Sequence, residues 1–155
     1  MGSLALRYLF CQLPLVSYWG GRLKGVSELF NLYRMFYKQE TNLSLASGFI
    51  SERIGNSESI ICVAQNEAGD YLGFTQLYPI FSSVSAKKSW VLNDLFVIKN
   101  ARGLGVANKL MIAARTLALE TNANGNALKT SEDNYNAQAL YDSLVYFAKT
   151  PAFCV

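Results

Sequence analysis

The sequence predicts a mixed α/β domain of 155 residues organised around one β-sheet. Apolar residues recur at helical spacing in several segments, and short apolar runs bounded by turn residues lie between them. Along the chain these give the order helix, hairpin, strand, helix, strand, helix, strand, which is typical of helices packed on one sheet. The sequence has no internal repeat and no linker, so residues 1–155 are expected to form a single domain. This length is sufficient to bury an apolar core.

Two helices are predicted before the first strands. Apolar residues from Leu29 to Tyr37 fall at i, i+3, i+4, i+7 and i+8, which places them on one helical face. Ser27 is the expected N-cap of this helix. A weaker pattern predicts a second helix over Leu43–Ile54.

A hairpin follows these helices. Apolar runs at Ile60–Ala64 and Tyr71–Tyr78 predict two strands. Residues 66–70 form the turn between them, where Gly69 suits a positive φ. Pro79 is expected to end the second strand because proline cannot donate to a strand ladder.

The second half of the chain alternates strands with helices. In order, we predict a strand at 90–98, a turn at 100–105, a helix with one apolar face from Val106 to Ala118, a strand at 127–130, a helix at 134–144 and an extended stretch from Tyr146.

The composition excludes several kinds of chemistry. Histidine is absent, so a Ser-His-Asp or Cys-His unit and a His-ligated metal are excluded, and proton transfer must use Asp, Glu, Tyr, Lys, Cys or water. The chain is 51% hydrophobic and 16% charged, which excludes a disordered protein. A net charge of +3 without a Lys/Arg run predicts that the protein has no nucleic-acid partner. The sequence contains no apolar run of about 18 residues, so we expect no membrane span.

The cysteines and the N-terminal segment complete the compositional argument. Cys11, Cys62 and Cys154 are far apart and odd in number, so we expect buried free thiols in a reducing, cytoplasmic compartment rather than a disulfide frame or a zinc site. Residues 1–24 are mostly apolar and are expected to form a strand plus loop rather than a secretory signal.

A strand-to-helix turn gives the strongest functional signal. Gly103 and Gly105 allow close approach of the backbone to a ligand, and the free N–H groups at a helix start favour an anion. Lys99, Arg102 and Lys109 flank the turn, as a pyrophosphate would favour. The pattern is neither a P-loop nor a Rossmann fingerprint. Glycine spacing alone leaves two interpretations open: a phosphate-bearing cofactor site, or a tight turn without a ligand.

Two motifs resemble signatures of the GNAT superfamily of N-acetyltransferases. Arg102-x-x-Gly105-x-Ala107 is similar to its Q/R-x-x-G-x-G/A acyl-CoA motif, and residues 92–97 resemble its central strand. A second pattern, Asn134-x-x-Ala137-x-x-Leu140-Tyr141-x-x-Leu144, resembles its helix with a late tyrosine. The order and separation agree over about residues 25–147. The resemblance implies an α+β, mostly antiparallel central sheet flanked by helices, the acyl-CoA N-acyltransferase fold.

The resemblance implies acetyl-CoA as cosubstrate and no metal. Backbone groups of Leu95, Phe96 and Val97 would pair with the pantetheine arm as if it were an extra strand, and Asn134 would contact the same arm. The pyrophosphate would be held by the amides of a seven-residue stretch: Arg102, Gly103, Leu104, Gly105, Val106, Ala107 and Asn108.

The catalytic roles follow from the same resemblance. A neutral amine would attack the thioester directly, a central-strand N–H would polarise its carbonyl, and Tyr141 would protonate the departing thiolate. Asp94 is the candidate general base, the alternative being that it binds a cationic amine or only hydrogen-bonds locally. The alternative for Tyr141 is a core tyrosine. This mechanism needs no histidine.

The acceptor side is predicted from aromatic and polar residues near Asp94. Tyr33, Tyr37, Phe81 and Asn93 are the candidate substrate-binding residues, because aromatic rings beside a carboxylate suit a small cationic amine. The alternative is that the aromatics of the first helix are simply its buried face. Gly73-Phe74, Tyr78-Pro79 and Asn93-Asp94 are similar to the polyamine-type branch of the superfamily.

The predicted function is acetyl transfer from acetyl-CoA to a primary amine of a small molecule, polyamine-like in the narrower version. The alternatives are a CoA-binding regulatory module without turnover and a protein lysine or N-terminal acetyltransferase. Residues 1–24 do not match the family's usual first strand, Val145 stands where the family usually has glycine, and the last strand is short or missing. A homodimer is therefore expected, since a partner would cover these edges.

Overall fold

The computed structural model describes residues 6–11, 21–128 and 135–143. The elements in chain order are β1 (Leu6–Cys11), α1 (Leu23–Phe36), α2 (Leu43–Gly55), β2 (Ile60–Asn66), β3 (Tyr71–Ser82), β4 (Lys87–Val97), the 3₁₀ turn η2 (Lys99–Ala101), α3 (Val106–Glu120), β5 (Asn126–Leu128) and α4 (Tyr135–Ser143).

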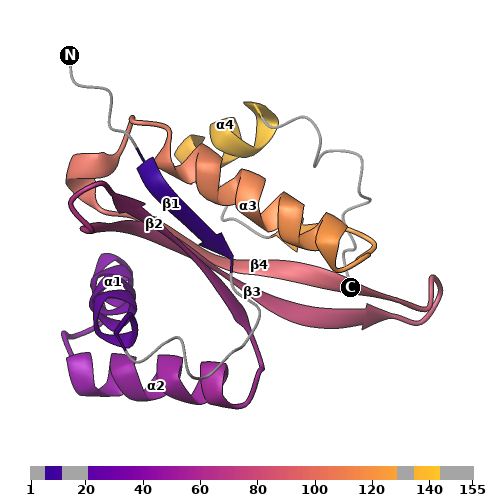
Figure 1. The fold of residues 1–155 in the computed structure, drawn as a ribbon, viewed down its shortest axis with the longest axis horizontal. Coiled ribbons are helices and arrows are strands. Elements are labelled where there is room, and N and C mark those ends of the chain that lie inside the picture. Colours follow the sequence, from indigo (N-terminus) through magenta and orange to yellow (C-terminus); the bar gives the residue numbers. More distant parts are fainter. Residues whose placement is uncertain (1–5, 12–20, 129–134, 144–155) are drawn as a thin grey trace.

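One five-stranded sheet in the order β1-β2-β3-β4-β5 organises the described residues. The pairs from β1 to β4 are antiparallel and the β4–β5 pair is parallel. Helices α1 and α2 lie on one face of the sheet, and α3 and α4 lie on the other (Figure 1). The predicted mixed, mostly antiparallel sheet flanked by helices is confirmed.

Each face of the sheet has its own apolar core. On one face, Val26 and Phe30 of α1 and Ile50 of α2 pack against Phe74 and Phe96 of the sheet. On the other face, α3 contributes a buried stripe that packs against alternating residues of β2, β3 and β4: Val106, Leu110, Met111, Ala114 and Leu117. The two helical layers therefore bury opposite sets of strand side chains, as the pleat of a sheet requires.

A β-bulge interrupts β4 at Asn93. Gln76 is paired with Asp94, whereas the next residue of β3, Leu77, is paired with Leu92. Asn93 is therefore the extra residue on β4, and such bulges bend a strand and re-aim its side chains. Leu92 packs in the α3-side core, while Asp94 accepts a hydrogen bond from α1.

Two details of the predicted elements are wrong. Ser27 is not an N-cap: α1 begins at Leu23 after Arg22, and the buried Ser27 hydroxyl donates to the carbonyl of Leu23 at 2.6 Å. Pro79 does not end β3, which runs on to Ser82 with Pro79 opposite Trp90. The register with β2 stops at Leu77, so no described strand on that edge needs the missing proline N–H.

The cysteine prediction is also corrected. Cys62 is completely buried in β2 and is disulfide-bonded, with Cys11 of β1 as its Cα partner across the strand pair. The argument for a reducing compartment therefore loses its support at this position. Cys154, Asn134, Val145 and the stretch from Tyr146 lie outside the described residues.

None of the helices in the described part of the chain is both long and apolar enough to cross a membrane.

Gly73 lets β3 and β4 approach closely. A Cβ at this position would lie 2.5 Å from the main-chain carbonyl oxygen of Phe96, a contact that only backbone movement can relieve. We expect Gly73→Ala to lower the free energy of unfolding by about 1–3 kcal/mol, measured by urea denaturation. The matched control is Gly48→Ala in α2, where no atom lies within 4 Å of the added Cβ. It should raise stability by about 0.5–1 kcal/mol. Equal effects of the two substitutions would contradict this account of Gly73.

Candidate active site

Asp94 lies on the α1 side of β4, directly after the bulge, and only 7% of its surface is exposed. Its Oδ1 accepts two hydrogen bonds, one from the Tyr33 hydroxyl at 2.8 Å and one from Asn93 Nδ2 at 3.1 Å. Its main-chain carbonyl accepts a third from the buried Thr75 hydroxyl at 2.8 Å. The carboxyl group is therefore held from α1 and from the bulge, and the main chain of Asp94 is held from β3.

Burial raises the pKa of Asp94 above its ordinary value, because removing a carboxylate from water disfavours its charged form. The hydrogen bonds from Tyr33 and Asn93 act in the opposite direction, since both donors favour the charged form. A carboxylate whose pKa is raised is a stronger base, which suits proton transfer near neutral pH.

Tyr33, a predicted substrate-binding residue, lies beside Asp94. Its hydroxyl donates to Asp94, and its ring lies among aromatic rings, with centroids 5.0 Å from Tyr37 and 5.7 Å from Phe74. Burial raises the pKa of Tyr33, and its bond to Asp94 and the charge of Asp94 raise it further. Tyr33 therefore stays protonated and remains a donor. Tyr37, also predicted to bind substrate, is 55% exposed.

Two further residues without a predicted role, Gln76 and Tyr78, lie on the same sheet face. Burial raises the pKa of Tyr78 to about 12, and the nearby charge of Asp94 contributes. Gln76 is the completely buried cross-strand partner of Asp94, and its Nε2 donates to the Ser59 hydroxyl at 2.7 Å. Its Oε1 has no hydrogen-bond partner in the described structure. Gln76 and Tyr78 stand two positions apart in a mostly apolar strand, and this spacing was the available signal.

Among the described residues, one edge of β4 has no strand partner beside Asp94. The Ile98 amide donates to the Leu72 carbonyl at 2.9 Å, and the Phe96 carbonyl faces Gly73. In an antiparallel ladder the intervening residues Leu95 and Val97 then direct their N–H and C=O groups to the other edge. Among the described residues β5 pairs only with 90–92, so Leu95 and Val97 have no strand partner there. Phe96 was predicted to pair with the cosubstrate as well, but its carbonyl is directed to β3.

The turn after β4 presents backbone amides. Gly103 and Gly105 have φ values of 75° and 77°, a left-handed conformation that favours glycine, and Gly105 caps α3 without any side-chain hydrogen bond. The Lys109 amide donates to the Gly105 carbonyl, so the preceding amides of α3 have no partner within the helix. These amides belong to three predicted residues: Val106, Ala107 and Asn108. Free N–H groups at the positive end of a helix dipole favour an anion such as pyrophosphate.

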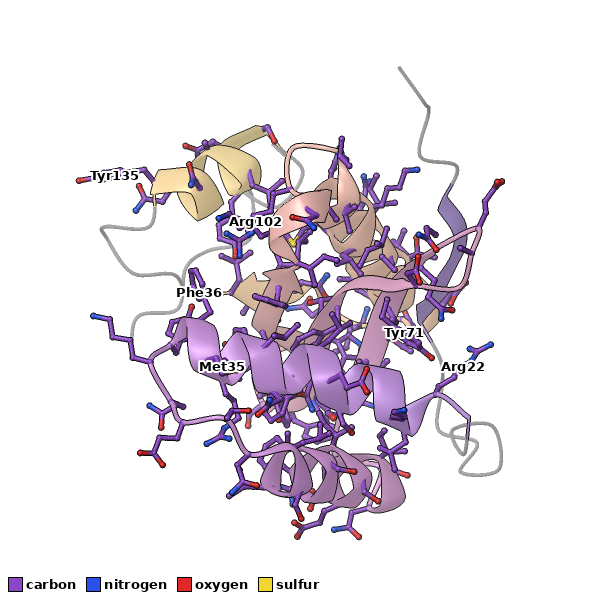
Figure 2. All side chains as sticks on the ribbon, turned by 90° about the vertical axis from the view of Figure 1, so that its left-hand side faces the viewer. Arg22, Met35, Phe36, Tyr71, Arg102 and Tyr135 are labelled. Atoms are coloured by element: carbon purple, nitrogen blue, oxygen red, sulfur yellow. The ribbon has the colours of Figure 1, made fainter. Side chains whose placement is uncertain are left out.

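Arg102 connects this turn to the open edge and to α1. Its Nε donates to the Val97 carbonyl at 3.0 Å, and its guanidinium lies 5.5 Å from the centre of the Phe36 ring. Figure 2 shows Arg102 beside Phe36 at the end of α1. Gly103 and Leu104 are exposed at the turn, so most of the predicted pyrophosphate-binding stretch lies on the surface.

The remaining predicted residues divide into near and distant ones. Tyr141 of α4 is half-buried against the α3-side core, and burial raises its pKa, with a further contribution from Tyr37. Asn93 is exposed on the bulge and contacts Asp94. Phe81 is 76% exposed near the tip of the β3–β4 hairpin. It lies five residues from Gln76, about 16 Å along an extended strand, so it is not assembled with Asp94.

Within the described ranges, no group of three or more His, Cys, Asp or Glu residues could hold a metal ion.

Comparisons with known proteins agree with this geometry. The sequence matches the model of the acetyltransferase (GNAT) family over residues 24–145. It is 44% identical over 121 residues to the uncharacterized N-acetyltransferase YhfO of Bacillus subtilis (strain 168), covering 78% of this chain and 80% of that protein. It is 28% identical over 108 residues to a probable acetyltransferase of Haemophilus influenzae, covering 70% of this chain and 74% of that protein.

Solved structures give the same result. The crystal structure of a probable acetyltransferase superposes with a TM-score of 0.77 at 38% sequence identity, covering 81% of this chain and 83% of that one. An aminoglycoside acetyltransferase from a soil metagenome shares the fold, with a TM-score of 0.72 at 18% identity over 87% of this chain and 86% of its own. On the family match, the relatives and the fold together, this chain belongs to the acetyltransferase (GNAT) family of N-acetyltransferases.

Proposed function

We propose that this protein transfers the acetyl group of acetyl-CoA directly to a primary amine of a small molecule. Three features that lie together carry the proposal. Asp94 of β4 is buried and hydrogen-bonded, the edge of β4 beside it has no strand partner among the described residues, and the start of α3, which follows β4, has no side-chain cap. Members of the GNAT family use acetyl-CoA as cosubstrate, and both relatives from Bacillus subtilis and Haemophilus influenzae are named as acetyltransferases.

The backbone around β4 suits a CoA molecule. Leu95 offers its N–H and C=O groups and Val97 its N–H group to the two amides of a pantetheine arm, which would extend the sheet as a strand does, while the Val97 carbonyl is bonded to Arg102. The free amides at the start of α3 offer donors to the pyrophosphate, and the two left-handed glycines keep side chains away from it. Asn134, which is predicted to contact the same arm, lies outside the described residues.

The side chains divide the proton transfers between them. Acetyl-CoA, when bound, supplies the acyl group as an activated thioester. Asp94 takes a proton from the acceptor amine, so that the nitrogen lone pair is free to attack. A β4 main-chain N–H stabilises the negative charge that develops on the carbonyl oxygen. Tyr141, whose pKa is raised, keeps its proton until it donates it to the departing sulfur.

The acceptor is proposed to be a small cationic amine. Asp94 offers the charge, and the rings of Tyr33 and Tyr37 beside it offer faces to a cation. That this amine is polyamine-like stays a prediction. The homodimer and the cytoplasmic location also stay predictions.

Tyr141→Phe tests the proposed general acid. We expect kcat to fall by about 10²- to 10⁴-fold, because the phenyl ring keeps the packing but cannot donate a proton. Thiol release from acetyl-CoA against a panel of amines measures this, and calorimetry should give an unchanged affinity for CoA. Tyr135→Phe is the matched control, since Tyr135 is 74% exposed on the same helix. Full activity of Tyr141→Phe would remove the proposed acid, and wild-type protein that does not bind CoA would refute the proposed function.

Asp94→Asn tests the buried carboxyl group. The native state holds this proton to a higher pH than the unfolded chain, whose pKa is near the ordinary 3.8, so this group makes stability fall as the pH rises above that value. The free energy of unfolding of Asp94→Asn, relative to wild type, should therefore increase between pH 4 and pH 7, while acetyl transfer is lost. The same substitution at the exposed Asp142 gives the baseline in urea denaturation. A difference that is constant with pH would contradict the burial of this charge.

Gly105→Ala tests the proposed pyrophosphate turn. Left-handed backbone costs an alanine roughly 1–2 kcal/mol, and relaxation of the turn would misalign the α3 amides. We expect the affinity for CoA to fall by roughly tenfold, measured by calorimetry. Gly69→Ala is the matched control, because Gly69 has a φ of 88° in the β2–β3 turn, outside the proposed site. Equal loss of CoA affinity in both variants would contradict the assignment.

A further inference from the structure

The two oxygens of the Asp94 carboxyl group have different surroundings. Both side-chain hydrogen bonds, from Tyr33 and from Asn93, end on Oδ1. Within the described residues no hydrogen bond reaches Oδ2. A carboxylate with two donors on one oxygen has a fixed orientation, and its other oxygen keeps its lone pairs for a ligand.

The bulge makes one of these two bonds possible. Consecutive residues of a regular strand point to opposite faces, so neighbouring side chains do not normally meet. At Asn93 the extra residue re-aims the side chain, and its amide reaches the adjacent carboxylate at 3.1 Å. The Thr75 hydroxyl holds the main-chain carbonyl of Asp94 from the neighbouring strand.

The ring of Tyr33 packs against three other aromatic rings. Its ring makes edge contacts with Phe74 at 5.7 Å and Phe96 at 6.1 Å, both of which are buried in the sheet core. It also contacts Phe30 one turn earlier in α1, at 6.1 Å. These contacts orient the ring so that its hydroxyl reaches Asp94 Oδ1.

We propose that Tyr33 is a positioning residue that holds Asp94 through Oδ1 and leaves Oδ2 as the oxygen that takes the acceptor's proton. This inference rests on the proposed function and adds a role for Tyr33: its hydroxyl holds the base, while its ring lies beside the proposed acceptor site. In the step itself one N–H bond of the acceptor breaks and one O–H bond forms at Oδ2. The electron pair stays on nitrogen, and Tyr33 keeps its own proton throughout.

Tyr33→Phe tests the proposal because it removes only the hydroxyl. Loss of a donor to the charged form raises the pKa of Asp94, so the acidic limb of the pH profile of kcat/KM should move to higher pH. On that limb kcat/KM should fall by roughly tenfold, while the KM for acetyl-CoA stays unchanged. Asn93→Ala, which removes the second donor to Oδ1, should move the limb in the same direction.

A spectroscopic readout separates this inference from the proposed function. The carboxyl carbon of Asp94, followed by NMR during a pH titration of labelled protein, should titrate at higher pH in Tyr33→Phe than in wild type. Tyr78→Phe is the matched control, because Tyr78 lies near Asp94 on the same sheet face and makes no hydrogen bond to it in the described structure. Its titration of Asp94 should match that of wild type.

Each outcome decides between the alternatives. A shift of both the NMR titration and the acidic limb in Tyr33→Phe, with no shift in Tyr78→Phe, supports the proposal. An unchanged titration in Tyr33→Phe, or an equal shift in Tyr78→Phe, overturns it whether or not the protein is active. A shifted titration with an unmoved acidic limb removes Asp94 as the base and overturns the positioning role. If wild-type protein acetylates no amine, the proposed function fails, and the titration still reports whether Tyr33 holds Asp94.

Discussion

A carboxylate removed from water must find hydrogen-bond donors within the protein, and much of this structure is arranged around that requirement at Asp94. One donor comes from α1, 61 residues away in sequence, and one comes from the bulge next to it. The position of α1 on the sheet is thereby coupled to the local path of β4. The aromatic residues that pack beneath α1 form the same cluster that holds the donor in place.

Strand β4 joins the two halves of the proposed site. Its α1-facing side presents the carboxyl group, its open edge presents main-chain groups, and its end leads into the turn that starts α3. Arg102 links these parts, since it donates to the Val97 carbonyl while its guanidinium lies over Phe36 of α1 (Figure 2). A movement of α1 would therefore be felt at the turn as well as at Asp94.

Local patterns predicted well whatever depends on neighbouring residues. The helix predicted over Leu43–Ile54 agrees with α2 to within a residue, and the positive φ predicted for Gly69 is confirmed. The hydrogen bond between Tyr33 and Asp94 could not be predicted, because it depends on how α1 packs on the sheet. It also depends on the bulge at Asn93, which is visible only in the pairing of β3 with β4. Pro79 misled for a related reason: whether a proline ends a strand depends on the neighbouring strand, which no local pattern reports.

The bulge at Asn93 also determines how this strand can tolerate changes in length. Leu92 and Asp94 are two residues apart and yet serve opposite faces of the sheet, because one residue between them is extra. Deleting Asn93 would leave Leu92 and Asp94 as ordinary neighbours, each still on its present face, with only the amide donor lost. Deleting a residue elsewhere in β4 would exchange the two faces for every position on one side of the gap. The bulge at Asn93 is thus the position where β4 could lose a residue while its side chains stay in the same two apolar cores.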